Sequence, residues 1–370
     1  MRTKFIVVVL AAISLPAFAQ SDPADGTDFD PRTNPQPWVR PLDRMGFHLG
    51  FPLATVTPML TGDDTGGLFE GSIEHIETDY YGPPHYHELS DETIIMIDGS
   101  AHLRLDGRDF TLTKGEWLHI PRGTIHSFKS TGNPAKWIIL KSPPGPPPRP
   151  NPTSECDRST FTTEMNADPV RMNRWYHDCV DDFYMVADAD IPGTPYTPSS
   201  YSPDFEVRPW VRPLDRQQFH LGFPAASVIP MLSAEDTGGA FTGSIEHIED
   251  DYYGPPHVHY DKSETIIMIE GSARLRVNGT DFTLTEGQWL HMPAGNVHGF
   301  DSTGHPAKWI IIQAPVSSET VDAEQSADCD RSNFTPEMNR DPETMSRWYH
   351  DCADDFYMVP EAGLPGDVLN

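Results

Sequence analysis

One stretch of this 370-residue sequence decides the fold: Gly82-Pro83-Pro84-His85-Tyr86-His87, followed by Glu92 and then Gly99. A second copy lies 172 residues further on and reads Gly254-Pro255-Pro256-His257-Val258-His259, followed by Glu264 and Gly271. Each copy has a later histidine behind a Pro-x-Gly turn, His126 in the first and His298 in the second. A period this long exceeds that of a solenoid unit, so the repeat indicates a duplicated domain.

The residue types in each copy suit a divalent transition metal. Three imidazoles and a carboxylate are accepted by Fe, Mn, Ni, Cu and Zn, so the residues do not choose among these ions. Residues i and i+2 of a strand point to the same side, so the paired histidines of each copy can face one interior. The sequence therefore predicts one metal site per domain, with the ligands His85, His87, Glu92 and His126, and His257, His259, Glu264 and His298.

The sequence around the histidines predicts an all-β fold. The apolar run Thr93–Ile97 stops at Asp98-Gly99, and the alternating segment Ala101–Leu105 turns at Asp106-Gly107. The second copy has Asn278-Gly279 at the same turn. Such dipeptides favour tight hairpins, because both central residues adopt positive φ. Many short strands joined by regular turns indicate a β-sandwich or β-barrel.

The full pattern, GxxHxHx4Ex6G followed by Gly115-x5-Pro121-x-Gly123-x2-His126, resembles the two motifs of the cupin superfamily. Its duplication resembles a bicupin, which implies two tandem jelly-roll barrels. The chain departs from the pattern in two details: the first glycine lies close to the histidines, and Ser130 and Ser302 replace the usual terminal asparagine. These departures concern local loop shape and leave the ligand positions in place.

The two domains, with four residues between the second histidine and the glutamate, are similar to those of quercetin 2,3-dioxygenases. This resemblance implies that an enolate or phenolate of a small substrate binds the open metal position and that O2 attacks the substrate. It also implies that Glu92 or Glu264 accepts the substrate proton as the catalytic base.

Three alternatives stay open at this point. The metal ion could serve as a Lewis acid in a lyase, isomerase or decarboxylase; bicupins that resemble oxalate decarboxylases usually have three residues in place of four. The protein could bind a small ligand without catalysis. The histidines could also merely fill a barrel, but both copies keep all four ligands while Tyr86 and Glu88 change to Val258 and Tyr260. We therefore favour metal binding.

Other histidines have weaker claims. His75 and His247 precede the first motif of each copy, and His119 and His291 precede the Pro-x-Gly turns. A role beside the metal is one interpretation, and an ordinary core or rim histidine is the one we favour. The tyrosine pairs before the ligand segments, Tyr80-Tyr81 and Tyr252-Tyr253, are likewise expected to pack in the ordinary way.

The ends of the domains are predicted from composition. Residues 37–186 and 209–361 form the two domains, and residues 187–208 form the linker. The proline-rich stretch Lys141–Glu155 is expected to run outside the sheets. Asp168-Pro169 and Asp341-Pro342 each predict the start of a helix, so a short helical tail should follow each barrel.

Residues 1–19 have the order of charged, apolar and small residues that is typical of a signal peptide; a membrane anchor is the alternative. We expect a periplasmic or secreted protein. Export favours one disulfide in each tail, Cys156 with Cys179 and Cys329 with Cys352, although four cysteines allow three pairings. The net charge of −29 argues against nucleic acid or an anionic membrane as partner. We expect a small-molecule substrate, and a homo-oligomer stays open.

Overall fold

A computed structural model describes residues 38–40, 47–48, 54–105, 107–144, 184–185, 210–212, 219–220, 226–250, 252–315, 344 and 357–358. Both repeats belong to one compact unit, Gln36–Asn370. No helix among the described residues is long and apolar enough to cross a membrane. The expected signal peptide, the four cysteines and the linker lie outside the described residues, so these features stay predictions, as do the exact domain boundaries.

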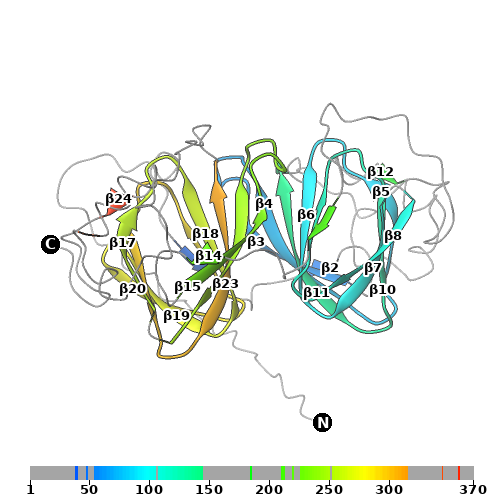
Figure 1. Cartoon of the computed structure of the whole chain (residues 1–370). Coiled ribbons are helices and arrows are strands. Elements are labelled where there is room, and N and C mark those ends of the chain that lie inside the picture. Colours follow the sequence, from blue (N-terminus) through cyan, green and yellow to red (C-terminus); the bar gives the residue numbers. More distant parts are fainter. Residues whose placement is uncertain are drawn as a thin grey trace, which may run out of the picture. The chain divides into compact units, whose positions relative to one another are not determined.

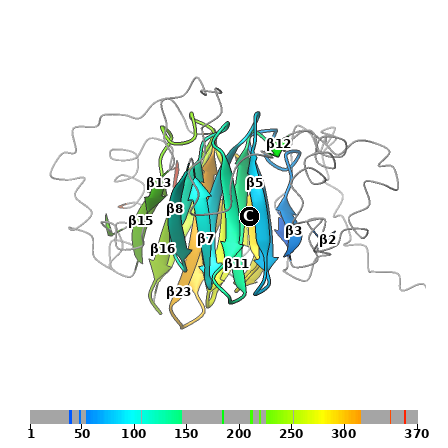
Figure 2. The same ribbon diagram turned by 90° about the vertical axis from the view of Figure 1, so that its right-hand side faces the viewer.

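Each repeat is a sandwich of a seven-stranded and a five-stranded sheet, and the two layers are visible in Figure 1. The large sheet of the first repeat has the order β13 (Trp210–Arg212), β9 (Trp117–Ile120), β6 (Asp91–Asp98), β11 (Ala135–Ser142), β4 (Glu70–Ile76), β3 (Ala54–Leu60) and β2 (Phe47–His48). Its small sheet has the order β12 (Tyr184–Met185), β5 (Tyr81–Tyr86), β10 (His126–Ser130), β7 (Ser100–Leu105) and β8 (Arg108–Thr113). Figure 2 shows the same strands from a second direction.

The second repeat has the same architecture. Its large sheet has the order β1 (Trp38–Arg40), β21 (Trp289–Met292), β18 (Ser263–Glu270), β23 (Ala307–Ala314), β16 (Thr242–Ile248), β15 (Ala226–Leu232) and β14 (Phe219–His220). Its small sheet has the order β20 (Thr280–Thr285), β19 (Ser272–Val277), β22 (His298–Ser302), β17 (Tyr253–Val258) and β24 (Tyr357–Met358). The predicted all-β fold with two tandem domains is confirmed.

The predicted hairpins are also present. Strands β7 and β8 pair from Leu105 and Arg108 outward, and β19 and β20 pair from Val277 and Thr280 outward. In the second hairpin Asn278 and Gly279 have φ values of 47° and 78°, as the turn requires. The tight turn therefore fixes the register of these strand pairs.

The central strands of the large sheets are apolar along their whole length because both of their faces are buried. In β6, Ile94 and Met96 point into the core of the first sandwich, between its two sheets. Ile95, between them, points to the other face of the sheet and into a second core. This explains why the run from Thr93 to Ile97 does not alternate between apolar and polar residues.

The second core joins the two repeats. It contains Met59, Leu60 and Phe69 of the first repeat together with Met231, Leu232 and Phe241 of the second. The rings of Phe69 and Phe241 lie 5.1 Å apart between their centroids. The large sheets therefore pack against each other through their outer faces, and each repeat buries apolar area against the other.

The repeats also exchange strands. Strand β1, from the beginning of the first repeat, pairs with β21 of the second, and β13 of the second repeat pairs with β9 of the first. Both pairings are antiparallel, and each adds an edge strand to the large sheet of the other repeat. The matching segments Trp38-Val39-Arg40 and Trp210-Val211-Arg212 are thus equivalent strands in exchanged positions.

One expectation about the chain after the first sandwich is wrong. Lys141 and Ser142 do not run outside the sheets, because β11 continues through them and pairs with β6 to its end. The helical tails lie outside the described residues apart from Thr344, which is helical. The tail regions also contribute the short strands β12 and β24, which pair with the ligand-bearing strands β5 and β17. These two strands were not predicted from the sequence.

We expect Gly71→Ala to lower the free energy of unfolding by about 1–3 kcal/mol, since an overfilled core forces its neighbours to shift. A Cβ at Gly71 would lie 2.8 Å from Cζ3 of Trp289, in the other repeat. The measurement is chemical denaturation. Trp289→Phe removes the clashing ring atoms, so the double variant should be more stable than the sum of the two single changes predicts. Additive changes would contradict this packing.

Candidate metal centres

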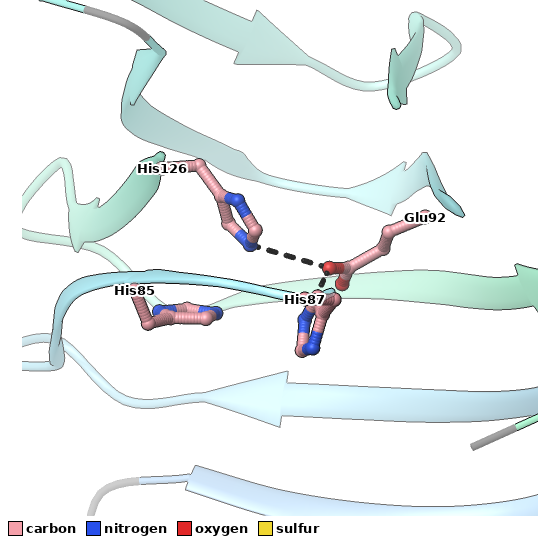
Figure 3. Close-up of side chains that lie close together, drawn as sticks. All are labelled: His85, His87, Glu92 and His126. Carbon is pink, nitrogen blue, oxygen red and sulfur yellow. Dashed lines mark ion pairs between the residues drawn. The ribbon is translucent and has the colours of Figure 1, made fainter. Parts of the chain in front are cut away.

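The four predicted ligands of the first repeat converge inside its sandwich. The candidate ligand atoms of His85, His87, Glu92 and His126 all lie within 4.8 Å of one another, and each side chain is buried. Nε2 of His87 lies 3.0 Å from Oε2 of Glu92, and Nε2 of His126 lies 3.3 Å from the same oxygen. Figure 3 shows both imidazoles facing this carboxylate. The structure therefore brings the predicted ligand set together.

The strands explain this convergence. His85 in β5 lies directly opposite His126 at the start of β10, and their ring centroids are 4.2 Å apart. The N–H of Gly123, in the Pro-x-Gly turn, donates to the carbonyl of His87 at 2.7 Å. Glu92 reaches the histidines from β6, in the opposite sheet. The site thus lies between the two layers, and the turn joins the segments that carry His87 and His126.

The second repeat brings its three histidines together in the same way. The ligand atoms of His257, His259 and His298 lie within 4.8 Å of one another. Glu264 is buried beside them, but its oxygens lie 3.6 Å from Nε2 of His259 and 3.8 Å from Nε2 of His298. The predicted glutamate is therefore present at this site but lies further from its histidines than Glu92 does.

Hydrogen bonds orient one histidine of each site for metal binding. Nδ1 of His126 lies 2.8 Å from the carbonyl of Thr124, and Nδ1 of His298 lies 2.8 Å from the carbonyl of Asn296. A carbonyl only accepts, so Nδ1 carries the proton and Nε2 of the neutral ring presents a lone pair to the cluster. Among the described residues, neither Nε2 atom has a hydrogen-bond partner. A metal ion would use these lone pairs.

The charges agree with this arrangement. Burial raises the pKa of Glu264, but its interactions with His259, His298 and Gln313 bring that pKa down to about 2. Burial lowers the pKa of His298 to about 4, although Glu264 opposes this shift. The pKa of Glu92 is likewise held well below its usual value, since its contacts with His126 and His87 outweigh burial.

At neutral pH the second site therefore holds an ionised carboxylate and a neutral imidazole whose lone pair faces it. Such electron-rich atoms repel each other in an apolar interior unless a cation lies between them. The atoms that bind a metal must also be free of protons, as the carboxylate of Glu264 and Nε2 of His298 are. The residues present thus fit a divalent metal ion, and the two clusters could hold one ion each.

The other histidines take the ordinary positions that we favoured. His75 is exposed, and His247 is half-exposed. His119 and His291 are buried, and their Nδ1 atoms bond the hydroxyls of Thr93 and Thr265 at 2.9 Å and 2.8 Å. Tyr80 and Tyr252 are buried core residues, while Tyr81 and Tyr253 are half-buried.

Two residues next to the glutamates were not predicted from the sequence. Lys141 lies opposite Glu92 in β11, and Gln313 lies opposite Glu264 in β23. The two repeats differ at this position, and that difference in the sequence could have drawn attention to it. The prolines that follow Lys141 conceal it, because they favour a segment outside the sheets.

Each repeat is thus a sandwich of two sheets with a buried histidine cluster and a glutamate. The chain therefore has two candidate metal sites, one in each repeat. A sequence model described as "Cupin domain" matches residues 72–141 and 244–313. The chain belongs to the cupin family and contains two cupin domains.

Known relatives agree with this assignment. Quercetin 2,3-dioxygenase of Bacillus subtilis (strain 168) is 26% identical over 286 residues, which cover 72% of this chain and 79% of that protein. The tetracenomycin polyketide synthase protein TcmJ of Streptomyces glaucescens is 34% identical over 111 residues, which cover 30% of this chain and 70% of that protein.

A solved structure is also similar. The formate complex of oxalate decarboxylase from Lactobacillus farciminis has a TM-score of 0.51 and 15% identity, covering 75% of this chain and 86% of that one. At this identity the likeness shows the shared fold alone.

We expect the purified protein to contain divalent metal, and His126→Ala and His298→Ala each to lose about one ion per chain, because each removes a lone pair from one cluster. The measurement is metal content by mass spectrometry. His75→Ala, which removes an exposed histidine, is the control and should keep the parent content. Metal content near zero in the parent protein, even after loading with metal, would rule out both sites.

Proposed function

We propose that this chain is a metal-dependent dioxygenase that acts on a small phenolic or enolisable organic substrate. The observation that carries the proposal is the buried cluster of His85, His87, Glu92 and His126, whose ligand atoms lie within 4.8 Å of one another. The similarity to a quercetin 2,3-dioxygenase over 72% of the chain supports the reaction class. The class of substrate is proposed together with the reaction.

The metal would be a divalent transition ion held by His85, His87 and His126, with Glu92, and by His257, His259 and His298 in the second domain. When bound, it would supply a Lewis-acidic centre with a position left for a substrate oxygen. The imidazoles are neutral ligands, so a divalent ion with one glutamate keeps one positive charge that no ligand compensates. A substrate that ionises to an enolate or a phenolate would provide the balancing negative charge.

The glutamates are the candidate general bases. Glu92 is buried, and its pKa lies well below the usual value, so it is ionised at neutral pH and can accept a proton. Its Oε2 lies 3.0 Å from Nε2 of His87, within the ligand cluster. Glu264 has the equivalent position in the large sheet of the second domain. Each carboxylate would take the proton of the substrate hydroxyl as that oxygen becomes charged.

Aromatic side chains shield both clusters from water. The ring of Phe128 lies 5.4 Å from that of His126 between centroids, and the ring of Phe300 lies 5.5 Å from that of His298. Both phenylalanines belong to the sandwich cores, whose apolar side chains line the same interior. Exclusion of water strengthens the interaction between an ionised substrate and the site.

We expect the metal-loaded protein to consume a flavonol with O2 and to lose that turnover when oxygen is removed. The assay follows the visible absorbance of the flavonol in aerobic and anaerobic samples. Glu92→Gln and Glu264→Gln each abolish proton acceptance at one site, and the variant at the more active site should lose about 100-fold or more in rate. Glu77→Gln, which changes an exposed carboxylate, is the control.

The outcome of this assay distinguishes a dioxygenase from a non-redox enzyme and from a binding protein. Turnover that continues without O2, and with Zn(II) as the bound ion, would contradict the dioxygenase and indicate a lyase, isomerase or decarboxylase. A ligand that raises the melting temperature without any product by mass spectrometry would indicate a binding protein.

We also propose that the protein is exported, to the periplasm or the medium. The support is the signal-peptide pattern of residues 1–19, with Ala17 and Ala19 before the expected cleavage site. Expression of the full chain should yield a mature protein that begins at Gln20, as measured by N-terminal sequencing. An intact N-terminus in the cytoplasmic fraction would contradict export.

A further inference from the structure

The two candidate metal centres differ at one position that lies against the glutamate. In the first domain this position is Lys141, which pairs across the sheet with Glu92 on one side and Glu70 on the other. In the second domain it is Gln313, which pairs with Glu264 on one side and Thr242 on the other. Directly opposed residues project from the same face of a sheet, so each of these side chains lies beside its glutamate.

In the second domain Gln313 holds the carboxylate. Its Nε2 donates a hydrogen bond to Oε2 of Glu264 at 2.9 Å. The same carboxylate lies 3.6 Å and 3.8 Å from the two nearest imidazole nitrogens, those of His259 and His298. The amide N–H occupies a lone pair of Oε2, the Glu264 oxygen that lies nearer to His259, so this oxygen is less available to a metal ion. The hydrogen bond therefore favours the observed position of the Glu264 carboxylate, which lies beside the histidines and not among them.

In the first domain the carboxylate lies among the histidines. Oε2 of Glu92 is 3.0 Å from His87 and 3.3 Å from His126, and Glu92 shares the 4.8 Å cluster with all three imidazoles. Lys141 acts on Glu92 through its positive charge. The second carboxylate opposite it, Glu70, offers the ammonium group another partner on the same face. Among the described residues, no side-chain amide donates a hydrogen bond to Glu92 as Gln313 does to Glu264.

We propose that the residue at position 141 or 313 makes the two metal centres unequal. The first centre binds a divalent ion through three histidines and Glu92, whereas the second binds it through three histidines while Gln313 retains Glu264 beside the ion. This inference rests on the metal binding proposed above. It follows that the first centre holds the ion more tightly, and that the second leaves one more position open for water or substrate.

A different role for Gln313 predicts the opposite result. Hydrogen bonds to a ligating carboxylate often orient it, and their loss typically lowers metal affinity by about 10–100-fold. If Gln313 oriented a ligating Glu264 in this way, removal of its amide would weaken binding at the second centre. If Gln313 retains Glu264 as proposed, removal of the amide strengthens binding there. The direction of the change therefore decides between the two roles.

The experiment uses the full chain with one centre disabled at a time. His257→Ala with His259→Ala leaves the first centre, and His85→Ala with His87→Ala leaves the second. Each metal-free protein is titrated with Co(II), whose visible absorption reports the number of ligands, and calorimetry gives the affinity. We expect the first centre to bind Co(II) about 10–100-fold more tightly than the second, with a distinct spectrum. Circular dichroism checks that each variant is folded.

Exchange of the two residues completes the test. In the protein that retains the second centre, Gln313→Met removes the amide at nearly constant size and should tighten Co(II) binding about tenfold, with a shift of the spectrum toward that of the first centre. In the protein that retains the first centre, Lys141→Gln introduces the amide and should weaken binding by a similar factor.

Three results would overturn the inference. Equal affinities and equal spectra at the two centres would do so, and so would weaker binding after Gln313→Met; in both cases the proposed metal sites would survive. If the folded proteins bound Co(II) at neither centre, this would instead contradict the metal binding on which the inference and the proposed function both rest.

Discussion

Electron-rich atoms confined in an apolar interior are the constraint around which each domain is built. Nε2 of His126 and Oε2 of Glu92 lie 3.3 Å apart among the aromatic and aliphatic side chains of the first sandwich. Burial of such groups without a balancing charge is costly, so the strands must hold them in place. The paired sheets do this by carrying His85 and His126 on one layer and Glu92 on the other.

The positions of the strands that carry the glutamates depend on contacts between the repeats. Strand β6, which carries Glu92, packs on one face against the core around the site and on the other against the core shared with the second repeat. Its neighbour β9 pairs with β13, which comes from the second repeat. The position of Glu92 is therefore determined by both halves of the chain, and the same holds for Glu264 in β18.

Much of this could be predicted from the sequence because the determining signals are local. The tight turn at Asn278-Gly279 requires positive φ, and the paired histidines of each copy follow the period of a strand, so hairpins and ligand sets could be read directly. The strand exchange could not, since β1 and β13 are short segments whose partners lie far away in sequence. Lys141 was misplaced for a related reason. The prolines after it suggest a loop, but cross-strand pairing with Glu92 and Glu70 keeps it in β11.

The exchanged strands have a consequence for the origin of the chain. A repeat cut out alone would lose an edge strand of its large sheet and expose the outer face that now packs against its twin. Two separate copies could satisfy both needs by associating around a two-fold axis and trading their first strands, and two-fold symmetry is the commonest in homodimers. The present chain has the arrangement that two such subunits would have if they were fused end to end. In a single chain the two repeats can carry different residues at equivalent positions, as Lys141 and Gln313 show.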